Sequence, residues 1–127
     1  GIDLIDDSYN ANPASMQAAL QAFGQKPSSG RKFVLLGEML ELGEISAEAH
    51  QTIFEATAAF DGCFLVGAGF AELRGAGDAH HNDADSMLIE RLLETLQPGD
   101  SLLIKGSNRV FWATGFVQQL AQALRGS

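Results

Sequence analysis

The sequence predicts an α/β fold in which a mostly parallel sheet carries helices on both faces. Apolar runs of strand length alternate with segments of helical period, which is the pattern of consecutive βα units. The apolar runs are rich in Val, Leu, Ile and Phe, as expected for strands covered on both faces. Gly, Asn and Asp collect at the junctions between the segments, where turns need them.

Four strands are expected at residues 2–6, 32–36, 62–66 and 101–105, with a weaker fifth near residues 79–82. Ligands of open α/β sheets bind outside the carboxyl ends of the strands. The polar residues that directly follow each strand are therefore the first place to look for a site.

The first helix is expected to begin after Asn12, which can cap its N-terminus, with Pro13 at the first helical position. It is expected to end at Gly24. Its apolar residues recur at the spacing i, i+3, i+4, i+7 and are Met16, Ala19, Leu20 and Phe23. This spacing places one buried stripe along the helix.

Three further helices follow the same pattern. Ser46 can cap the second, whose apolar side comprises Ala49, Ile53, Ala56 and Phe60. Asp85 can cap the third, which buries Leu88, Ile89, Leu92 and Leu96 before Pro98-Gly99 stops it. The last is expected to run to the C-terminus with Phe116, Val117, Leu120 and Leu124 in register.

Length and composition favour one soluble domain covering residues 1–127. Hydrophobic residues make up 46% of the 127 positions and charged residues 19%, which is typical of a globular protein. Eight basic and sixteen acidic residues give a net charge of −8, which argues against nucleic acid or an anionic membrane as the main partner.

The single cysteine, Cys63, excludes an intrachain disulfide and a cysteine-based zinc site. Neither a signal peptide nor an apolar run of membrane-spanning length is expected, so we predict a cytoplasmic location. The chain begins at Gly1 without Met, and we expect it to be a piece of a larger protein.

After the first strand, Asp6 and Asp7 lead into a polar turn. Successive strand side chains point to opposite faces, so one of the two carboxylates is expected to be structural. The other has the chemistry to accept hydrogen bonds from a ribose diol or to bind magnesium, and Asn10 has groups that read a polar edge. Turn and cap formation alone would also explain these residue types.

After the second strand, the loop that begins at Glu38 mixes apolar and acidic residues. Met39 and Leu40 are costly to expose together, so they are expected to pack on a neighbouring surface or on the domain's own core. His50 follows on the next helix, where a histidine on a helix face without any ligand role is the simpler interpretation.

Two other junctions favour ordinary structure. Gly67-Ala68-Gly69 lacks the third glycine of a dinucleotide-binding loop and is interpreted as a tight βα turn. His80 and His81 lack further ligands at metal spacing, so a solvated loop is expected there instead of a metal site.

After the last strand, Lys105-Gly106-Ser107 and Arg109 combine two cations with an expected helix start. Two cations beside a helix N-terminus can seat a carboxylate or a phosphate. A strand end with a capping Ser or Asn is the competing interpretation.

Three segments stand in a fixed order and span the chain nearly end to end. They are DSYNANP at residues 7–13 with Ser15 and Met16, LGEMLELG at residues 36–43 with Ser46 and His50, and KGS at residues 105–107. Together they resemble the C-terminal domain of the Mur ligase family, and within it the ligases that add D-alanyl-D-alanine to UDP-MurNAc-tripeptide.

The resemblance implies a Rossmann-like third domain that closes over a central ATPase domain, while an N-terminal domain holds the UDP-sugar. The implied reaction activates the tripeptide carboxylate as an acyl phosphate, which the dipeptide amine attacks, and ADP and phosphate are released. ATP and Mg²⁺ would be bound mainly by the missing central domain, and the sequence contains no G-x-x-x-x-G-K-[ST] loop. We therefore expect no catalytic residue and no metal ligand in this chain, and no activity from it alone.

Residue by residue, the resemblance implies a nucleotide contact at Asp7, which meets the ribose, with Asn10 and Asn12 beside it. The cleft for the incoming dipeptide would be lined by Lys105, Gly106, Ser107 and Arg109. A possible interdomain or site loop would comprise Glu38, Met39, Glu41 and His50. The family usually has Arg directly after Lys-Gly-Ser, whereas here Asn108 precedes Arg109.

Two alternative functions share parts of the pattern. A phosphoacceptor signalling domain has this length, an early acidic pair and a late Lys, but needs an Asp where Val66-Gly67-Ala68 stands. Another ligase of the superfamily, such as a folylpolyglutamate synthetase, carries a His in its first motif where this chain has Asn10.

Overall fold

The computed structural model describes residues 1–71, 73, 75, 77–111 and 113–126. Its sheet has the strand order β1-β5-β2-β3-β4, and every pair of neighbouring strands is parallel. The strands are β1 (Asp3–Asp7), β2 (Lys32–Gly37), β3 (Gly62–Val66), β4 (His80–His81) and β5 (Ser101–Lys105). The four main strands agree with the expected ranges to within one residue, and the weak fifth strand is present as β4.

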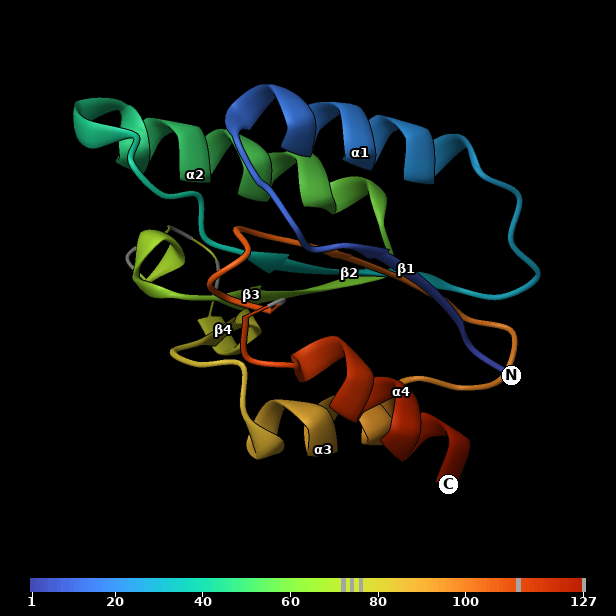
Figure 1. The fold of residues 1–127 in the computed structure, drawn as a ribbon. Helices are drawn as coiled ribbons and strands as arrows, with labels where there is room; N and C mark the ends of the chain where they lie inside the picture. Colours follow the sequence, from blue (N-terminus) through green and yellow to red (C-terminus); the bar gives the residue numbers. More distant parts are fainter. Residues whose placement is uncertain (72, 74, 76, 112, 127) are drawn as a thin grey trace.

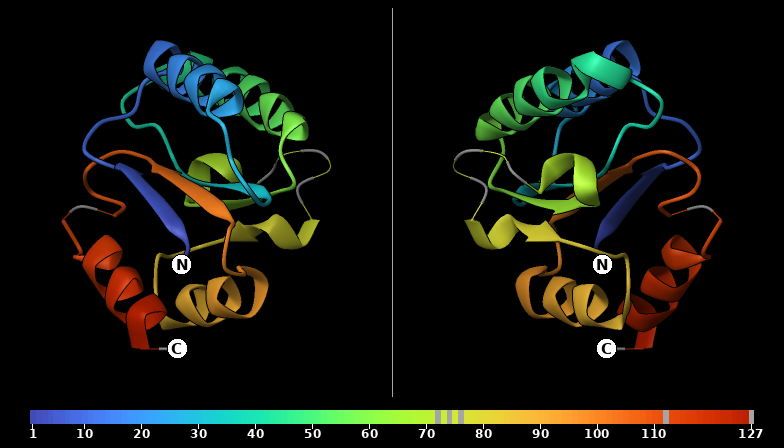
Figure 2. Two further views of the ribbon diagram at one scale, coloured as in Figure 1. Left: turned by 90° about the vertical axis from the view of Figure 1, so that its right-hand side faces the viewer. Right: turned by 90° about the vertical axis from the view of Figure 1, so that its left-hand side faces the viewer.

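Helices cover both faces of the sheet, as predicted. Figure 1 shows α1 (Pro13–Gln25) and α2 (Ser46–Ala56) on one face, with α3 (Ser86–Thr95) and α4 (Phe116–Gly126) on the other. The views in Figure 2 show the same three layers from the side. Short 3-10 turns connect the main elements at Gly43–Ile45, Thr57–Ala59, Ala68–Phe70 and Gly77–Ala79.

The sheet separates two hydrophobic clusters. Along β2, Phe33 and Leu35 pack toward α3 and α4, whereas Val34 and Leu36 pack toward α1 and α2. This alternation follows from the two-residue period of a strand. All five residues of β5 are buried, as expected for a central strand covered on both sides.

Two of the three predicted N-caps are confirmed. The Asn12 side chain accepts a hydrogen bond from the Ser15 amide, and the Ser15 hydroxyl accepts one from the Asn12 amide, which completes a capping box. Asp85 accepts from the Leu88 amide at the start of α3. Both caps pair amide groups that a helix start would otherwise leave without partners.

The third cap prediction is wrong. Ser46 is the first helical residue of α2 and has right-handed helical dihedral angles, because the turn at Gly43–Ile45 already leads the chain into the helix. The second helix also ends earlier than expected, at Ala56, so Phe60 packs from the segment that follows a 3-10 turn.

Asp100 stabilises the edge of the sheet at which the strands begin. Its carboxylate accepts hydrogen bonds from the Gln97 amide and from the amide and guanidinium of Arg31, at 2.9–3.0 Å. Burial alone would raise the pKa of Asp100, but the hydrogen bonds from Gln97 and Arg31 outweigh it and hold that pKa below its ordinary value. The guanidinium also lies over the Phe33 ring.

Candidate functional site

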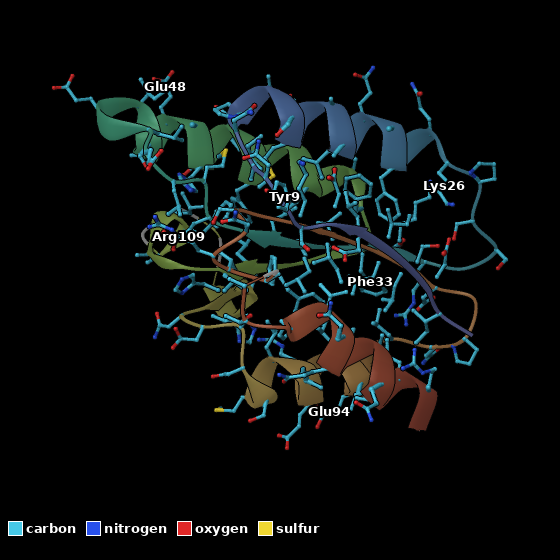
Figure 3. The ribbon with its side chains drawn as sticks, in the orientation of Figure 1. Tyr9, Lys26, Phe33, Glu48, Glu94 and Arg109 are labelled. Carbon is cyan, nitrogen blue, oxygen red and sulfur yellow. The ribbon has the colours of Figure 1, made fainter. Side chains whose placement is uncertain are left out.

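The carboxyl ends of β1, β5 and β2 meet at one edge of the sheet. Asp7 is the register partner of Lys105, and Lys105 is the register partner of Leu36. Three segments that lie far apart in the sequence, at residues 7–13, 36–43 and 105–107, are therefore neighbours. Figure 3 shows Arg109 at this edge, on the side of the molecule opposite Lys26.

Lys105 lies inside this edge and not in the solvent. The residue is 3% exposed, and its ammonium donates hydrogen bonds to Asp7 Oδ2 and to the Asn10 carbonyl oxygen, both at 3.0 Å. Burying an ammonium is costly unless it is paired and hydrogen-bonded, and both conditions are met here. The Asp7 side chain stays half exposed, so its carboxylate remains accessible to a ligand.

The neighbouring acidic residue has a different role. Asp6 Oδ1 accepts hydrogen bonds from the amide and the hydroxyl of Ser8, which closes the turn after β1. The expectation that one carboxylate of the pair is structural is therefore confirmed, and that residue is Asp6. Asn12 uses its side-chain oxygen as the cap of α1, whereas Asn10 lines a hollow.

One hollow of about 230 Å³ opens over the ends of β1 and β5, and we call it the Asn10 hollow. It is lined by Tyr9, Asn10, Ala11, Leu40, Glu41, Ser107, Asn108 and Arg109. Ser107 is 8% exposed, and its hydroxyl has no hydrogen-bond partner among the described residues. An unpaired buried hydroxyl costs free energy, so Ser107 is a polar group of this edge whose hydrogen bond the described residues leave unmade.

A second hollow of about 470 Å³ lies next to it over the ends of β2, β3 and β4, and we call it the Glu38 hollow. Its lining includes Glu38, Leu40, Asn82, Asp83 and Arg109. Arg109 and Leu40 border both hollows. The Arg109 side chain is exposed and makes no hydrogen bond or ion pair with any other described residue, so its charge is available to an anion.

Gly106 serves the site through its backbone. A Cβ atom at Gly106 would lie 2.8 Å from Gly37 Cα and 2.9 Å from the Phe111 ring, so the chain directly after β5 approaches the end of β2 more closely than a side chain permits. Ser107 follows directly after this close approach.

The chain after Lys105-Gly106-Ser107 differs from the expectation. Residues 108–111 and 113–115 form turns, and α4 begins only at Phe116. The predicted helix start beside Lys105 is therefore wrong, and α4 does not bring its N-terminus next to Lys105. Turn bonds, such as the one from the Val110 amide to the Ser107 carbonyl oxygen at 3.0 Å, occupy this segment instead.

The loop after β2 combines buried and exposed side chains. Met39 is 3% exposed and His50 is fully buried, whereas Glu38 is half-buried and Glu41 is exposed. Of these four predicted loop residues, Glu38 and Glu41 reach the two hollows. Glu41 has a φ of +62°, in the left-handed region, which is uncommon for a residue other than glycine.

Gly67 confirms the interpretation of Gly67-Ala68-Gly69 as a tight turn. It has a φ of +107°, and an added Cβ would overlap the Glu38 carboxylate. His80 Nε2 donates to the Gly67 carbonyl oxygen at 2.8 Å. Glycine at this position therefore makes room for Glu38 at the edge of its hollow.

The two adjacent histidines are not in a solvated loop, which corrects that expectation. They form β4, where the Gly67 amide donates to the His81 carbonyl oxygen and Arg91 donates to His81 Nε2. Burial, followed by the charge of Arg91, lowers the pKa of His81.

The sequence interpretation missed several lining residues. Asn82 and Asp83 reach the Glu38 hollow because β4 ends there, and Tyr9 is 63% exposed beside the Asn10 hollow. An exposed aromatic within a polar turn is the signal that would have identified Tyr9.

Within the described residues, no group of three or more His, Cys, Asp or Glu side chains is arranged to hold a metal ion, and none of the helices has the length and apolar character needed to cross a bilayer.

A family model described as "Mur ligase, glutamate ligase domain" matches residues 1–108. The UDP-N-acetylmuramoyl-tripeptide–D-alanyl-D-alanine ligase of Mycobacterium tuberculosis (strain CDC 1551 / Oshkosh) is 37% identical over 135 residues, which cover 85% of this chain and 26% of that protein. The corresponding ligase of Escherichia coli K12 is 36% identical over 110 residues, covering 82% of this chain and 24% of that ligase. The chain thus spans about a quarter of the length of these curated relatives.

Solved structures give the same match. The MurF ligase of Thermotoga maritima, crystallised in complex with ADP, superposes with a TM-score of 0.76 at 27% identity, covering 97% of this chain and 30% of that one. A MurF structure from Acinetobacter baumannii gives 0.76 at 31% identity, covering 94% and 28%. These matches agree with the Mur ligase interpretation, and none of them is a phosphoacceptor domain or a folylpolyglutamate synthetase.

Proposed function

Since the chain belongs to the Mur ligase family and corresponds to its C-terminal, glutamate ligase domain, we propose that it forms one wall of the active site of an ATP-dependent amide ligase. The proposed reaction joins D-alanyl-D-alanine to UDP-MurNAc-tripeptide in peptidoglycan synthesis, in the cytoplasm. The names of the relatives support this choice of substrates.

The observation that carries the proposal is the convergence of three motifs around an unpartnered hydroxyl. Ser107 Oγ is buried without a partner among the described residues. Asn10 and Glu41, from the other two motifs, line the same hollow, together with the exposed Arg109. Asp7 stands beside them with half of its side chain exposed. Such a set suits a ribose diol on one side and a carboxylate or phosphate on the other.

The chain is proposed to need a second wall. The Asn10 hollow of about 230 Å³ is smaller than the roughly 300–1,000 Å³ of complete ligand pockets, so it fits an edge of a nucleotide and not the whole molecule. ATP and Mg²⁺ are proposed to be held mainly by the preceding central domain. In that arrangement Asp7 and Asn10 contact the nucleotide, while Ser107 and Arg109 face the incoming dipeptide.

The test is a substrate panel on the full-length protein that contains this chain. Purified enzyme is incubated with ATP, Mg²⁺ and UDP-MurNAc-tripeptide, and ADP release and product mass are measured with D-alanyl-D-alanine, D-alanine or L-glutamate as acceptor. The proposal predicts an amide product of the dipeptide and ADP in equal amounts. A product with L-glutamate alone, or ADP release without any amide product, would refute it.

A further inference from the structure

The loop from Glu38 to Glu41 forms the shared border of the Asn10 and Glu38 hollows. Glu38 and Leu40 line the Glu38 hollow, and Leu40 and Glu41 line the Asn10 hollow. Any shift of this loop would therefore change both hollows at once. The hydrogen bonds that fix its backbone decide how well the proposed site is preformed.

Two backbone amides of the loop are tied to the rest of the domain. The Glu38 amide donates to the Val66 carbonyl oxygen at 2.9 Å, which continues the pairing of β2 with β3. The next amide, that of Met39, lies beyond the sheet and donates to His50 Nε2 at 3.0 Å. His50 is thus the anchor at the point where the loop leaves the sheet.

The His50 ring is held at both of its nitrogens and by one aromatic contact. Its Nδ1 lies 2.7 Å from the Ser46 carbonyl oxygen, one helical turn earlier in α2, and its ring packs edge-on against Phe70 with centroids 4.7 Å apart. Because Nε2 accepts from Met39, Nδ1 carries the proton and donates to Ser46. An added Cβ at Gly69 would overlap the ring, so the turn after β3 also makes room for it.

We propose that His50 is a positioning residue: it touches no ligand, and through the Met39 amide it fixes the loop that borders both hollows. This inference rests on the proposed function for its kinetic consequence, but its structural part stands on the contacts of His50 alone. An imidazole at this position supplies an acceptor to the loop and a donor to α2 from one rigid ring, which ties the loop to a helix.

Two substitutions separate the acceptor that His50 supplies to the Met39 amide from the donor that it supplies to α2. Because Gln places an amide oxygen near the position of Nε2, His50→Gln keeps an acceptor for the Met39 amide. His50→Asn is shorter and reaches only the Ser46 carbonyl oxygen, so it loses that acceptor. Both variants lose the ring contact with Phe70, so the loss of that contact does not distinguish them.

Leu96→Ala serves as a control for stability. Leu96 is buried in the other hydrophobic cluster, beyond the last turn of α3, and takes no part in the site. Its truncation lowers the stability of the domain without touching the loop.

The first readout is amide hydrogen exchange of the full-length protein over residues 37–42. We expect faster exchange in His50→Asn, and nearly unchanged exchange in His50→Gln and Leu96→Ala at temperatures well below their Tm. Equal exchange in the two His50 variants would overturn the proposal, and this readout does not depend on any ligase activity.

The second readout is steady-state kinetics. We expect His50→Asn to raise KM for D-alanyl-D-alanine about 3- to 10-fold, the equivalent of one neutral hydrogen bond, with a smaller change in kcat. His50→Gln should restore KM to within about twofold of wild type. If Leu96→Ala raises KM as much as His50→Asn at the same loss of Tm, His50 acts on general stability and the proposal fails. If the wild-type enzyme forms no dipeptide product, the proposed function fails, while the exchange result still decides the role of His50.

Discussion

Lys105 Nζ lies 3.0 Å from Asp7 Oδ2, so a buried cation on β5 holds the half-exposed carboxylate at the end of β1. The same ammonium binds the Asn10 carbonyl oxygen. The resemblance implies a dipeptide contact for Lys105 and nucleotide contacts for Asp7 and Asn10. In the structure Lys105 contacts both Asp7 and Asn10, and Lys105 lines neither the Asn10 hollow nor the Glu38 hollow. A direct contact between Lys105 and the dipeptide stays a prediction, and the geometry favours a role through Asp7 and Asn10.

Lys105→Met in the full-length enzyme is expected to raise KM for ATP more than KM for D-alanyl-D-alanine. Met keeps the apolar stem but removes the two hydrogen bonds that hold the Asp7 carboxylate and the Asn10 carbonyl oxygen. Loss of a hydrogen bond to a charged group costs roughly 1.5–3 kcal/mol, which is about 10- to 100-fold in affinity if it is fully transmitted. Initial rates at varied ATP and varied dipeptide measure both constants. A selective rise for the dipeptide would instead assign Lys105 to that substrate.

Ser107→Ala is expected to lower substrate affinity without lowering stability. The hydroxyl makes no hydrogen bond with a described residue, so its removal relieves an unpaired buried polar group. The Tm should stay level or rise slightly, while KM for D-alanyl-D-alanine rises. The matched control is Thr57→Val, because the Thr57 hydroxyl does donate to the Phe54 carbonyl oxygen and lies outside the site. Thr57→Val should lower Tm and leave both KM values near wild type; a drop in Tm for Ser107→Ala would contradict the assignment.

Asp100→Asn is expected to lower the Tm at neutral pH. It is also expected to make the Tm less sensitive to a fall in pH. A carboxyl group whose pKa is lowered by folding stabilises the native state above its unfolded pKa of about 3.9. That contribution is lost as the pH falls through the lowered folded value. At pH 7 the variant should melt about 3–8 °C below wild type, and the difference should shrink steadily below about pH 4. Melting curves from pH 7 to pH 2.5 measure it, with Glu94→Gln on the exposed side of α3 as the control. A constant difference across this range would show that Asp100 acts through packing and not through its charge.

The isolated chain is expected to fold and to release no phosphate from ATP. Its two hydrophobic clusters close around the sheet, but its sequence contains no phosphate-binding loop of the G-x-x-x-x-G-K-[ST] type. A cooperative thermal transition should therefore accompany background phosphate release with ATP, UDP-MurNAc-tripeptide and D-alanyl-D-alanine. Turnover by the isolated chain would show that the catalytic machinery is not divided between domains as proposed.

Local signals predicted the elements of this fold well. The cap at Asn12 was predictable because the side chain, Pro13 and Ser15 lie within four residues of one another. The cap prediction failed at Ser46 although its side chain can cap a helix, because the 3-10 turn before it already has helical geometry. No residue type at position 46 reveals that turn.

The sequence singled out candidate residues for the site, but their contacts could not be predicted from it. Lys105 stands out in the sequence as a cation at a strand end, but its burial depends on β5 lying between β1 and β2, which strand order alone decides. His50 likewise looks like an ordinary helical histidine, because its partner, the Met39 amide, lies eleven residues earlier in an irregular loop. Asn82 and Asp83 join the site only because the short strand β4 pairs with β3.

The most direct test of the proposed site is the effect of Asp7→Asn on KM for ATP in the full-length enzyme. Asn keeps the size of the side chain but weakens its acceptance of the two hydroxyls of a ribose, so KM for ATP should rise about 10-fold or more. The Tm should fall as well, because Asn removes the charge that pairs the buried Lys105 ammonium, so KM is measured well below the Tm of the variant. In the double variant Asp7→Asn/Lys105→Met, the fold-rise in KM for ATP should be smaller than the product of the two single fold-rises. Both substitutions disturb the same contact between Asp7 and Lys105. An unchanged KM for ATP in Asp7→Asn would contradict the account and leave Asp7 with only a structural role.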